Sequence, residues 1–469
     1  MKGTLEREVK LGAGEIRLDE LSGEPLATRI FTSTYHDTPD YRLARLGITL
    51  RHRMEGEFAA WQLKLPRPGG RLELEAPAEL PSLPAEVLDL LAAPLHGRSL
   101  APVATLRTER RGVRLRLEGA EADVTLDDVA VVEGAGGGTS FLELEAELQG
   151  DGDLDAVEAA LRAAGASDGD GRPKLLRVLG LEVLPPRPAS DDPGEHLRVM
   201  IERQYEQILR RDPGARLGDD PEDLHDFRVA VRRLRALLRA ARPLVVETWS
   251  EPLRDELAWL GRALGPARDL DVLLEHVRSE VDALGDEREA AAPLVAALES
   301  ERARARETML AELHSRRYLD LLAALERAGR SPVLGAEQEP LAGIAAREFR
   351  RLRRTMARVD AGSSDEALHR ARIRGKRARY AAELAEATIG RPATRFIERA
   401  KRFQDVIGEH QDAIVAEDRI RALTERAPQA TSLVAGRLVE RQRERRQAAR
   451  KALPKAWKQL KRAGRKAFA

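Results

Sequence analysis

The hydrophobic pattern of this 469-residue chain changes once, at a proline-rich stretch over residues 184–194, and that change limits the folds it can adopt. Before the stretch, short segments alternate apolar and polar residues, as in LEREVKL at 5–11 and FLELEAEL at 141–148. After it, leucine and alanine recur every three or four residues over long segments. A period of two is typical of strands, and a period near 3.6 is typical of helices. The sequence therefore predicts an α+β protein with an antiparallel sheet first and an all-helical part second.

We predict two domains, residues 1–184 and 193–469, joined by a proline-rich linker over 185–192. The two parts differ in charge: residues 1–187 contain 23 Lys and Arg against 32 Asp and Glu, and the remainder contains 56 against 46. The basic excess is densest in residues 437–469, with 13 basic and 2 acidic residues. A segment of this density predicts a polyanion or an acidic surface as a partner.

The helical part repeats itself. Two pairs of segments match in the same order and at nearly the same spacing: HDFRVAVRRLR at 225–235 with HRARIRGKRAR at 369–379, and LGPARDLDV at 264–272 with IGEHQDAIV at 407–415. Such a pattern indicates an internal duplication. We therefore expect two pseudo-symmetric helical bundles, near residues 196–326 and 338–469.

The composition excludes several kinds of site. The chain has no cysteine, so disulfides, thiolate metal sites and cysteine nucleophiles are excluded, and a metal would be held by carboxylates or imidazoles. That ligand set favours a hard cation. No apolar run approaches the roughly 18 residues of a membrane span, and no apolar signal segment precedes the first strand pattern. We therefore expect a cytoplasmic protein without a membrane partner.

The first strand pattern places three charged side chains on one face. Glu6, Glu8 and Lys10 are two residues apart, so in an extended strand they point the same way. An ordinary sheet would turn such a face toward water, whereas a barrel could turn it inward and cover its apolar outside with helices. The pattern by itself leaves both arrangements open.

With its further motifs, the first part resembles the CYTH family, the triphosphate tunnel metalloenzymes. The motifs occur in order: Glu6-x-Glu8-x-Lys10, then YHDTPDYRLARLGITLRHR at 35–53, WQLKLP at 61–66 and FLELEAEL at 141–148. The resemblance implies a closed antiparallel β-barrel with helices packed outside and a charged tunnel inside. It also implies a Mg²⁺ or Mn²⁺ ion that bridges the glutamates and a triphosphate.

The resemblance assigns roles to individual positions. It implies that Glu6, Glu8 and Lys10 are catalytic, and that the metal is held by Glu6, Glu8, Asp127, Glu143 and Glu145. The triphosphate would be bound by Arg51, Arg53, Lys64, Arg107, Arg114, Arg116 and Lys174. Arginines crowd residues 107–116, and which of them face the tunnel stays open. Pro173 stands before Lys174 where the family usually has a serine, which sets this lysine apart from the family pattern.

The second part resembles the CHAD domain, a helical module often fused to CYTH domains. A basic stripe at helical spacing occurs in each repeat: His225, Arg228, Arg232, Arg235 and Arg239 in the first, and His369, Arg372, Lys376 and Arg379 in the second. The resemblance implies that these stripes bind inorganic polyphosphate. A solvated charged face and metal binding by the two histidines are the alternatives.

The leading hypothesis is a metal-dependent inorganic triphosphatase joined to a polyphosphate-binding module. The same fold also supports thiamine triphosphatase and adenylate cyclase activity, but only 4% of the residues are aromatic, which favours a substrate without a base or ring to stack. The other alternative is a non-catalytic protein that binds polyphosphate or nucleic acid and is targeted to polyphosphate bodies. The sequence suggests no protein partner.

Overall fold

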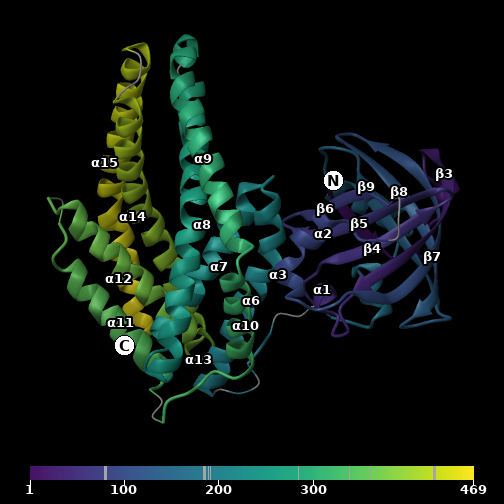
Figure 1. The fold of residues 1–469 in the computed structure, drawn as a ribbon, viewed down its shortest axis with the longest axis horizontal. Helices are drawn as coiled ribbons and strands as arrows, with labels where there is room; N and C mark the ends of the chain where they lie inside the picture. Colours follow the sequence, from purple (N-terminus) through teal and green to yellow (C-terminus); the bar gives the residue numbers. More distant parts are fainter. Residues whose placement is uncertain are drawn as a thin grey trace. The chain divides into compact units, whose positions relative to one another are not determined.

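The computed structural model describes residues 1–78, 82–182, 186–188, 190, 192–283, 285–336, 339–360, 362–425 and 429–468 (Figure 1). They form two compact units, Met1–Pro185 with Leu209–Leu217, and Pro186–Ile208 with Gly218–Ala469. The predicted domain end at 184, part of the predicted linker 185–192 and the predicted repeat start at 338 lie outside the described residues. The domain limits therefore stay predictions.

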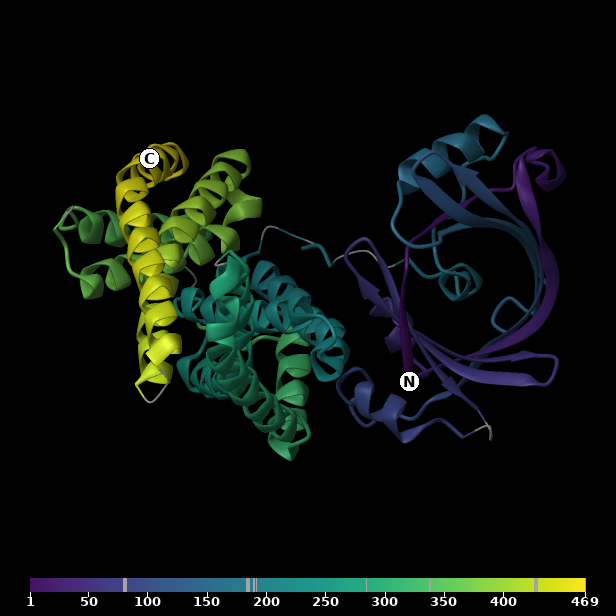
Figure 2. The same cartoon turned by 90° about the horizontal axis from the view of Figure 1, so that it is seen from above.

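The first unit contains one antiparallel sheet of nine strands. The strands are β1 (Lys2–Glu6), β2 (Glu8–Leu11), β3 (Gly23–Asp37), β4 (Thr49–Glu55), β5 (Phe58–Arg67), β6 (Gly70–Pro77), β7 (Ala101–Leu117), β8 (Ala120–Gly134) and β9 (Ser140–Leu148). Their order across the sheet is β1-β6-β5-β4-β3-β7-β8-β9-β2. Figure 2 shows these strands curving around a common interior.

The two edge strands, β1 and β2, are consecutive pieces of one segment with only Arg7 between them. Glu6 pairs with Arg71 of β6, and Glu8 pairs with Glu147 of β9, so residues 2–11 border both ends of the sheet. No hydrogen-bonded strand pair joins β1 to β2 among the described residues, and the strand order is open. The predicted closed barrel is therefore not confirmed, although the predicted antiparallel sheet followed by a helical region is.

The alternation of β9 shows which face of the sheet is covered. Leu144 and Ala146 pack outward against Val157 and Leu161 of helix α4 (Leu154–Ala163). The intervening glutamates therefore point inward. Helix packing on the outside is thus as predicted for α4.

Helix α5 (Lys174–Val178) differs from that expectation. Its Leu175 and Leu176 pack with Leu106 of β7 and Val129 of β8, which lie on the inward faces of their strands. Helix α5 therefore fills one end of the interior and does not cover the outside. This position brings Lys174 into the charged interior.

The second unit is helical. Its helices are α6 (Pro193–Leu217), α7 (Pro221–Ala240), α8 (Glu247–Asp282), α9 (Ala292–Leu313), α10 (Arg316–Arg330), α11 (Leu341–Met356), α12 (Asp365–Leu384), α13 (Glu386–Ile389), α14 (Arg391–Thr424) and α15 (Gln429–Ala467). The last turns of α6 group with the first unit. Among the described residues, no helix combines the length and apolar composition that crossing a bilayer requires.

The matched sequence segments occupy equivalent helices. The first pair lies in α7 and α12, and the second pair lies in α8 and α14. Asp220 and Ser364 cap α7 and α12, because each side chain accepts a hydrogen bond from a backbone N–H in the first turn. Helix α7 packs against α12, so the two copies of the basic segment lie side by side.

Candidate active site

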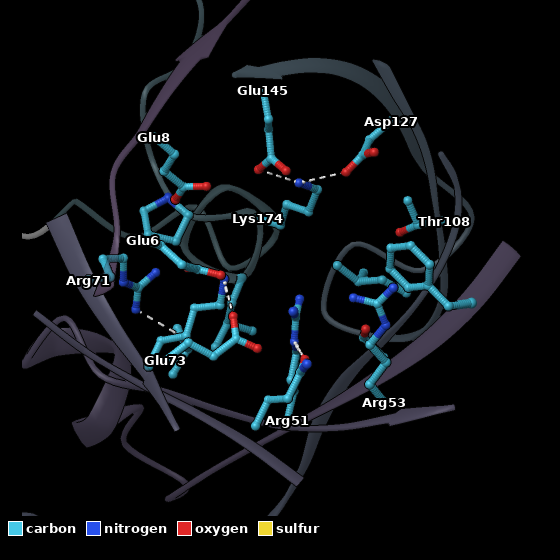
Figure 3. Close-up of a pocket in the computed structure, with 18 of the residues that line it drawn as sticks. Glu6, Glu8, Arg51, Arg53, Arg71, Glu73, Thr108, Asp127, Glu145 and Lys174 are labelled. Atoms are coloured by element: carbon cyan, nitrogen blue, oxygen red, sulfur yellow. Dashed lines mark hydrogen bonds and ion pairs between the residues drawn. The ribbon is translucent and has the colours of Figure 1, made fainter. Parts of the chain in front are cut away.

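A charged cavity of about 430 Å³ lies inside the sheet of the first unit (Figure 3). Its acidic lining residues are Glu6, Glu8, Glu73, Glu75, Asp127, Glu145 and Glu147. Its basic lining residues are Lys10, Arg29, Arg51, Arg53, Lys64, Arg71, Arg110 and Lys174. Strand alternation explains this composition, because residues two apart on several strands turn toward the same interior.

On one side of the cavity, two lysines are held by the carboxylates of β9. Lys174 Nζ donates hydrogen bonds of 2.6 Å to Glu143 and to Glu145, and it lies 3.0 Å from Asp127. Lys10 Nζ also contacts Glu143 and Glu145. Burial opposes the charge of Glu145, but the two lysines outweigh it and hold the pKa of this carboxyl well below its usual range. Glu145 is therefore ionised and paired with the two lysines, whereas burial raises the pKa of Glu143 beside it.

Arg110 extends this cluster from β7. Its guanidinium donates two hydrogen bonds of 2.7 Å to Asp127 and a third of 2.7 Å to Glu145. The fork of an arginine matches a carboxylate in this way. Arg110 is therefore the residue of the crowded 107–116 segment that faces the cavity.

A second acidic group lies on β1 and β6. Lys64 Nζ lies 2.6 Å from Glu6 and 2.9 Å from Glu73. Burial, together with a hydrogen bond to Glu73, raises the pKa of Glu6 to about 8. One proton is thus shared by two facing carboxyl groups, an arrangement that a cation between them would relieve.

An arginine wall faces the acid–lysine cluster across the cavity (Figure 3). Arg51 of β4 donates a 2.7 Å hydrogen bond from Nε to Gln62. Arg53 lies over the ring of Phe31, 3.6 Å from its centroid, and donates a 2.9 Å hydrogen bond to Glu55. Burial, followed by repulsion from Arg51, lowers the pKa of Arg53 to about 10. Glu55 does not fully offset the burial and repulsion of Arg53, so an anion in the cavity would stabilise its guanidinium group.

The predicted metal ligands fit a hard cation by their chemistry. Their donor atoms are all carboxylate oxygens, which Mg²⁺ and Mn²⁺ prefer. The shared proton of Glu6 and Glu73 marks a place where a dication would replace it. In the described part of the chain, however, no three His, Asp or Glu side chains stand together as a ready ligand set, because lysines occupy the carboxylates. Cation binding would require those ion pairs to loosen.

Most of the predicted site residues of the first unit come together in this cavity. Its lining includes the predicted Glu6, Glu8, Lys10, Arg51, Arg53, Lys64, Asp127, Glu145 and Lys174. Glu143 is buried beside them and pairs with Lys174. Their roles in metal binding and catalysis stay predictions.

Three predicted triphosphate residues on β7 do not line the cavity. Arg107 is exposed, because the inward positions of this strand are Leu106, Thr108 and Arg110. Arg114 pairs with Asp123 at 2.7 Å and Arg116 is exposed, both beyond the end of the cavity lining. The three arginines are therefore not among the residues that line the cavity, because Arg107 points outward and the other two lie beyond its end.

Sequence reasoning missed the contribution of β6. Arg71, Glu73 and Glu75 all line the cavity. The segment GRLELEAP at 70–77 shows the same alternation as the other strands and could have been found by that signal. Glu147 and Arg29 were also missed, although Glu147 continues the alternation of β9.

In the second unit, the basic stripes of α7 and α12 face each other. Burial lowers the pKa of Lys376 to about 7, and repulsion from Arg372 and from Arg232 of α7 adds to the shift. Arg228 donates a 3.1 Å hydrogen bond to the carbonyl oxygen of Gly265. The ammonium group of Lys376 therefore lies among cations from both repeats, which favours an anionic ligand.

The remaining stripe residues differ in surroundings. His369 contacts Gln411 at 3.2 Å, and Arg379 lies 3.3 Å from Glu383. Arg235 is exposed on α7. Arg239 does not belong to the residues that face each other. Burial, followed by repulsion from Arg377, lowers the pKa of Arg239, and Arg377 lies on another side of α12 from the stripe.

The histidine of each repeat follows a glutamate at Glu-x-x-His spacing, at Glu222 with His225 and at Glu366 with His369. Burial, followed by repulsion from Arg268, lowers the pKa of His225. Arg268 lies 3.1 Å from Glu222. No third His, Asp or Glu completes a metal site there in the residues that the structure describes.

Comparison with known proteins identifies both parts. Residues 4–173 match the CYTH domain and residues 199–421 match the CHAD domain. Uncharacterised proteins from two strains of Mycobacterium tuberculosis are each 33% identical over 487 aligned positions, covering 95% of this chain and 92% of the relative.

Two solved structures are similar to parts of the chain. The CHAD domain from the plant Ricinus communis matches at 26% identity and a TM-score of 0.47, over 59% of this chain and 94% of that one. A putative adenylyl cyclase from Hippeastrum, described as having a dominant triphosphatase activity, matches at 20% identity and a TM-score of 0.26, over 39% of this chain and 97% of that one.

Proposed function

Because the chain belongs to the family of proteins that join a CYTH domain to a CHAD domain, we propose that its first unit hydrolyses inorganic triphosphate and its second unit binds inorganic polyphosphate. The observation that carries the first proposal is the charge division of the cavity. Arg51 and Arg53 lie on one side, and Asp127, Glu145 and Lys174 lie on the opposite side. A string of phosphates needs cationic donors, and a carboxylate wall suits a divalent cation beside them.

The residues of the cavity have separable tasks in this proposal. Arg51, Arg53 and Arg71 bind and orient the phosphate oxygens through their planar guanidinium groups. Lys10 and Lys174 carry protons at Nζ that can be donated to phosphate oxygens. Glu6, Glu8, Glu73, Asp127 and Glu145 are the residues that would hold the cation. A bound divalent cation would neutralise charge on the phosphates and lower the pKa of a coordinated water.

The cavity favours inorganic triphosphate over nucleoside or thiamine triphosphate. Its aromatic lining residues are Phe31 and Tyr35. Arg53 covers the ring of Phe31, and the Tyr35 hydroxyl lies 3.4 Å from Arg51. Trp61 is buried against His36 and His52 and does not line the cavity. Within the described residues, no free aromatic face is left there for a base or a thiazolium ring to stack on.

We expect the full-length chain to release phosphate from tripolyphosphate only with Mg²⁺ or Mn²⁺ present. The reason is that the carboxylate wall would repel the substrate without a cation between them. The measurement is a phosphate-release assay with tripolyphosphate, ATP, thiamine triphosphate and long-chain polyphosphate, with each metal and with a chelator. Turnover that survives the chelator, or faster turnover of ATP than of tripolyphosphate, would contradict the inorganic triphosphatase proposal.

The polyphosphate proposal rests on the facing stripes of α7 and α12. Arg232, Arg372 and Lys376 repel one another, and partial burial of Arg372 and Lys376 adds to the cost. Asp412 is the nearby acid, but burial raises the pKa of its carboxyl and limits its compensation. A chain of phosphates between the two helices would supply the missing negative charge.

This arrangement predicts a pH dependence of polyphosphate binding. Lys376 has a pKa of about 7 in the free protein, and a bound polyanion favours its protonated form. Binding above pH 7 therefore takes up a proton, so the affinity should fall as the pH rises through 7, by up to about tenfold per pH unit. Titrations between pH 6 and 9 would measure this slope.

The control for that titration is Lys376→Arg, which keeps a positive charge over the whole range. Its affinity should not change across the same pH range. If the variant and the original protein show the same slope, Lys376 does not contact the polyanion.

A further inference from the structure

Helix α12 carries arginines on a second side that the proposed stripe does not use. Arg370, Arg374 and Arg377 each lie two positions before a member of the stripe. Two residues turn an α-helix by about 200°, so this set lies on a different side of α12 from the stripe. With Arg358 at the end of α11, we call these four residues the outer arginines.

The outer arginines line a cavity of about 350 Å³ at α11 and α12. Val359 and Ile373 form its apolar part, and its lining includes no acidic side chain in the part of the chain that the structure describes. Four guanidinium groups around one hollow repel one another. An anion bound in this hollow would reduce that repulsion.

The outer arginines are not held by acids at contact distance. Within the described residues, none of the four forms a hydrogen bond or ion pair with an acid, although Glu366 acts on Arg370 and Glu348 acts on Arg377 from a longer distance. The Nε atom of Arg377 is buried without a partner. Other arginines of the same unit are paired, such as Arg317 with Glu256 and Arg242 with Glu251, both at 2.7 Å. The contrast indicates a missing anionic ligand rather than a general shortage of acids.

A second cavity links the outer arginines to the stripe of α7. It has a volume of about 490 Å³ and is lined by both Arg239 and Arg377. Arg239 is the last member of the α7 stripe, and Arg377 is one of the outer arginines. This cavity therefore joins Arg239 of α7 to Arg377 of α12, and its lining also includes Arg242, Arg347 and Arg351 together with Glu339 and Glu348.

We infer that the outer arginines form a second anion groove, which takes the continuation of the same condensed-phosphate chain. This inference rests on the proposed polyphosphate function. A sufficiently long chain passes between α7 and α12, turns past Arg239 and Arg377, and engages both sides of α12. Linking two sites through one ligand raises affinity without new contacts at either site, so the second unit selects for chain length.

The geometry favours a condensed-phosphate chain over duplex DNA as the occupant. An α-helix with its side chains is about 10 to 12 Å wide. Duplex DNA has a persistence length of about 50 nm and does not bend around an object of that size. A flexible single chain of phosphates does.

The test compares polyphosphates of about ten and about one hundred phosphates, with the full-length chain and a chelator that prevents turnover. The outer variant is Arg358→Gln with Arg370→Gln and Arg374→Gln. The matched control is Arg395→Gln with Arg462→Gln and Lys466→Gln, which removes the same charge from another cavity of this unit. Circular dichroism and thermal melting check that both variants are folded.

We expect the outer variant to lose about tenfold or more in affinity for the long chain and about twofold or less for the short chain. Its slope of log affinity against log salt for the long chain should decrease by about 2, since three phosphate contacts are lost. The control should bind both chains as the original protein does.

Two outcomes would overturn the second groove: equal losses of affinity in the outer variant and the control, or equal losses of affinity for the short and the long chain. If the original protein binds neither polyphosphate better than DNA of equal charge, the proposed function of the second unit fails instead. The two failures are therefore distinguishable.

Discussion

Replacing Glu8 by glutamine is expected to lower kcat for tripolyphosphate about a thousandfold while leaving the thermal melting temperature nearly unchanged. Glu8 lines the cavity, and its ion pair with Lys10 is long at 3.5 Å. Glu8 lies outside the tight cluster of Glu143, Glu145 and Lys174. Glutamine has the same size as glutamate but lacks the negative charge that a divalent cation needs. The substitution therefore reduces activity and leaves the stability of the fold nearly unchanged.

A metal-ligand role makes a second measurement decisive. The cation concentration for half-maximal activity should rise in Glu8→Gln, and high Mn²⁺ should restore part of the rate. The matched control is Glu121→Gln, the same chemical change at a β8 residue outside the cavity, where Glu121 lies 3.5 Å from Arg116. Near-normal activity and unchanged metal dependence in a folded Glu8→Gln protein would show that the metal site has been assigned to the wrong residues.

Strand periodicity predicted the charged set on β9 but could not decide which face of the sheet is inside. Glu143 and Glu145 alternate with Leu144 and Ala146, and either face of such a strand can face water. The decision comes from helix α4, which covers the apolar side. The contact is between β9 and α4, and the periodicity of each segment alone does not show that the two segments pack together.

The arginines of β7 show a second limit. Leu106, Thr108 and Arg110 line the cavity, so Arg107 points the other way. Arg107 and Arg110 are three residues apart, so in a regular strand they lie on opposite faces. The spacing of arginines alone does not fix which of them turns inward, because that depends on which face of the sheet is covered.

Helical spacing was a better guide in the second unit, but only to each helix by itself. It predicted the stripe of α12, including Lys376, and the stripe of α7, including Arg232. That the two stripes face each other follows from the packing of α7 on α12, which spacing cannot show. For the same reason, the sequence grouped Arg239 with the facing residues although it lies beside Arg377.

The facing stripes give the second large expected effect. Arg232→Glu combined with Lys376→Glu should weaken binding of long-chain polyphosphate at least about a hundredfold, because two cations that contact the ligand become anions. Arg372 can pair with a glutamate at position 376, so the helix packing should survive. Circular dichroism checks this, and Arg232→Gln with Lys376→Gln provides a milder version with the same direction.

The matched control tests the basic C-terminal helix as the alternative binding surface. Several arginines of α15 are already engaged: Arg445 lies 2.7 Å from Glu409, and Arg450 donates a 2.8 Å hydrogen bond to the carbonyl oxygen of Ser363. Lys451 and Lys455 are exposed, so Lys451→Glu with Lys455→Glu makes the same charge change where only a nonspecific surface would respond.

Salt dependence cannot tell whether the polyanion binds the facing stripes or α15, since any polyanion contact weakens as salt increases. Comparing the two variants can distinguish these surfaces. We expect the stripe variant to lose binding and the α15 variant to retain it within about threefold, with duplex DNA bound more weakly than polyphosphate by the original protein. If the α15 variant loses binding while the stripe variant keeps it, the polyanion contacts the C-terminal helix, and the cations around Lys376 do not form the binding site.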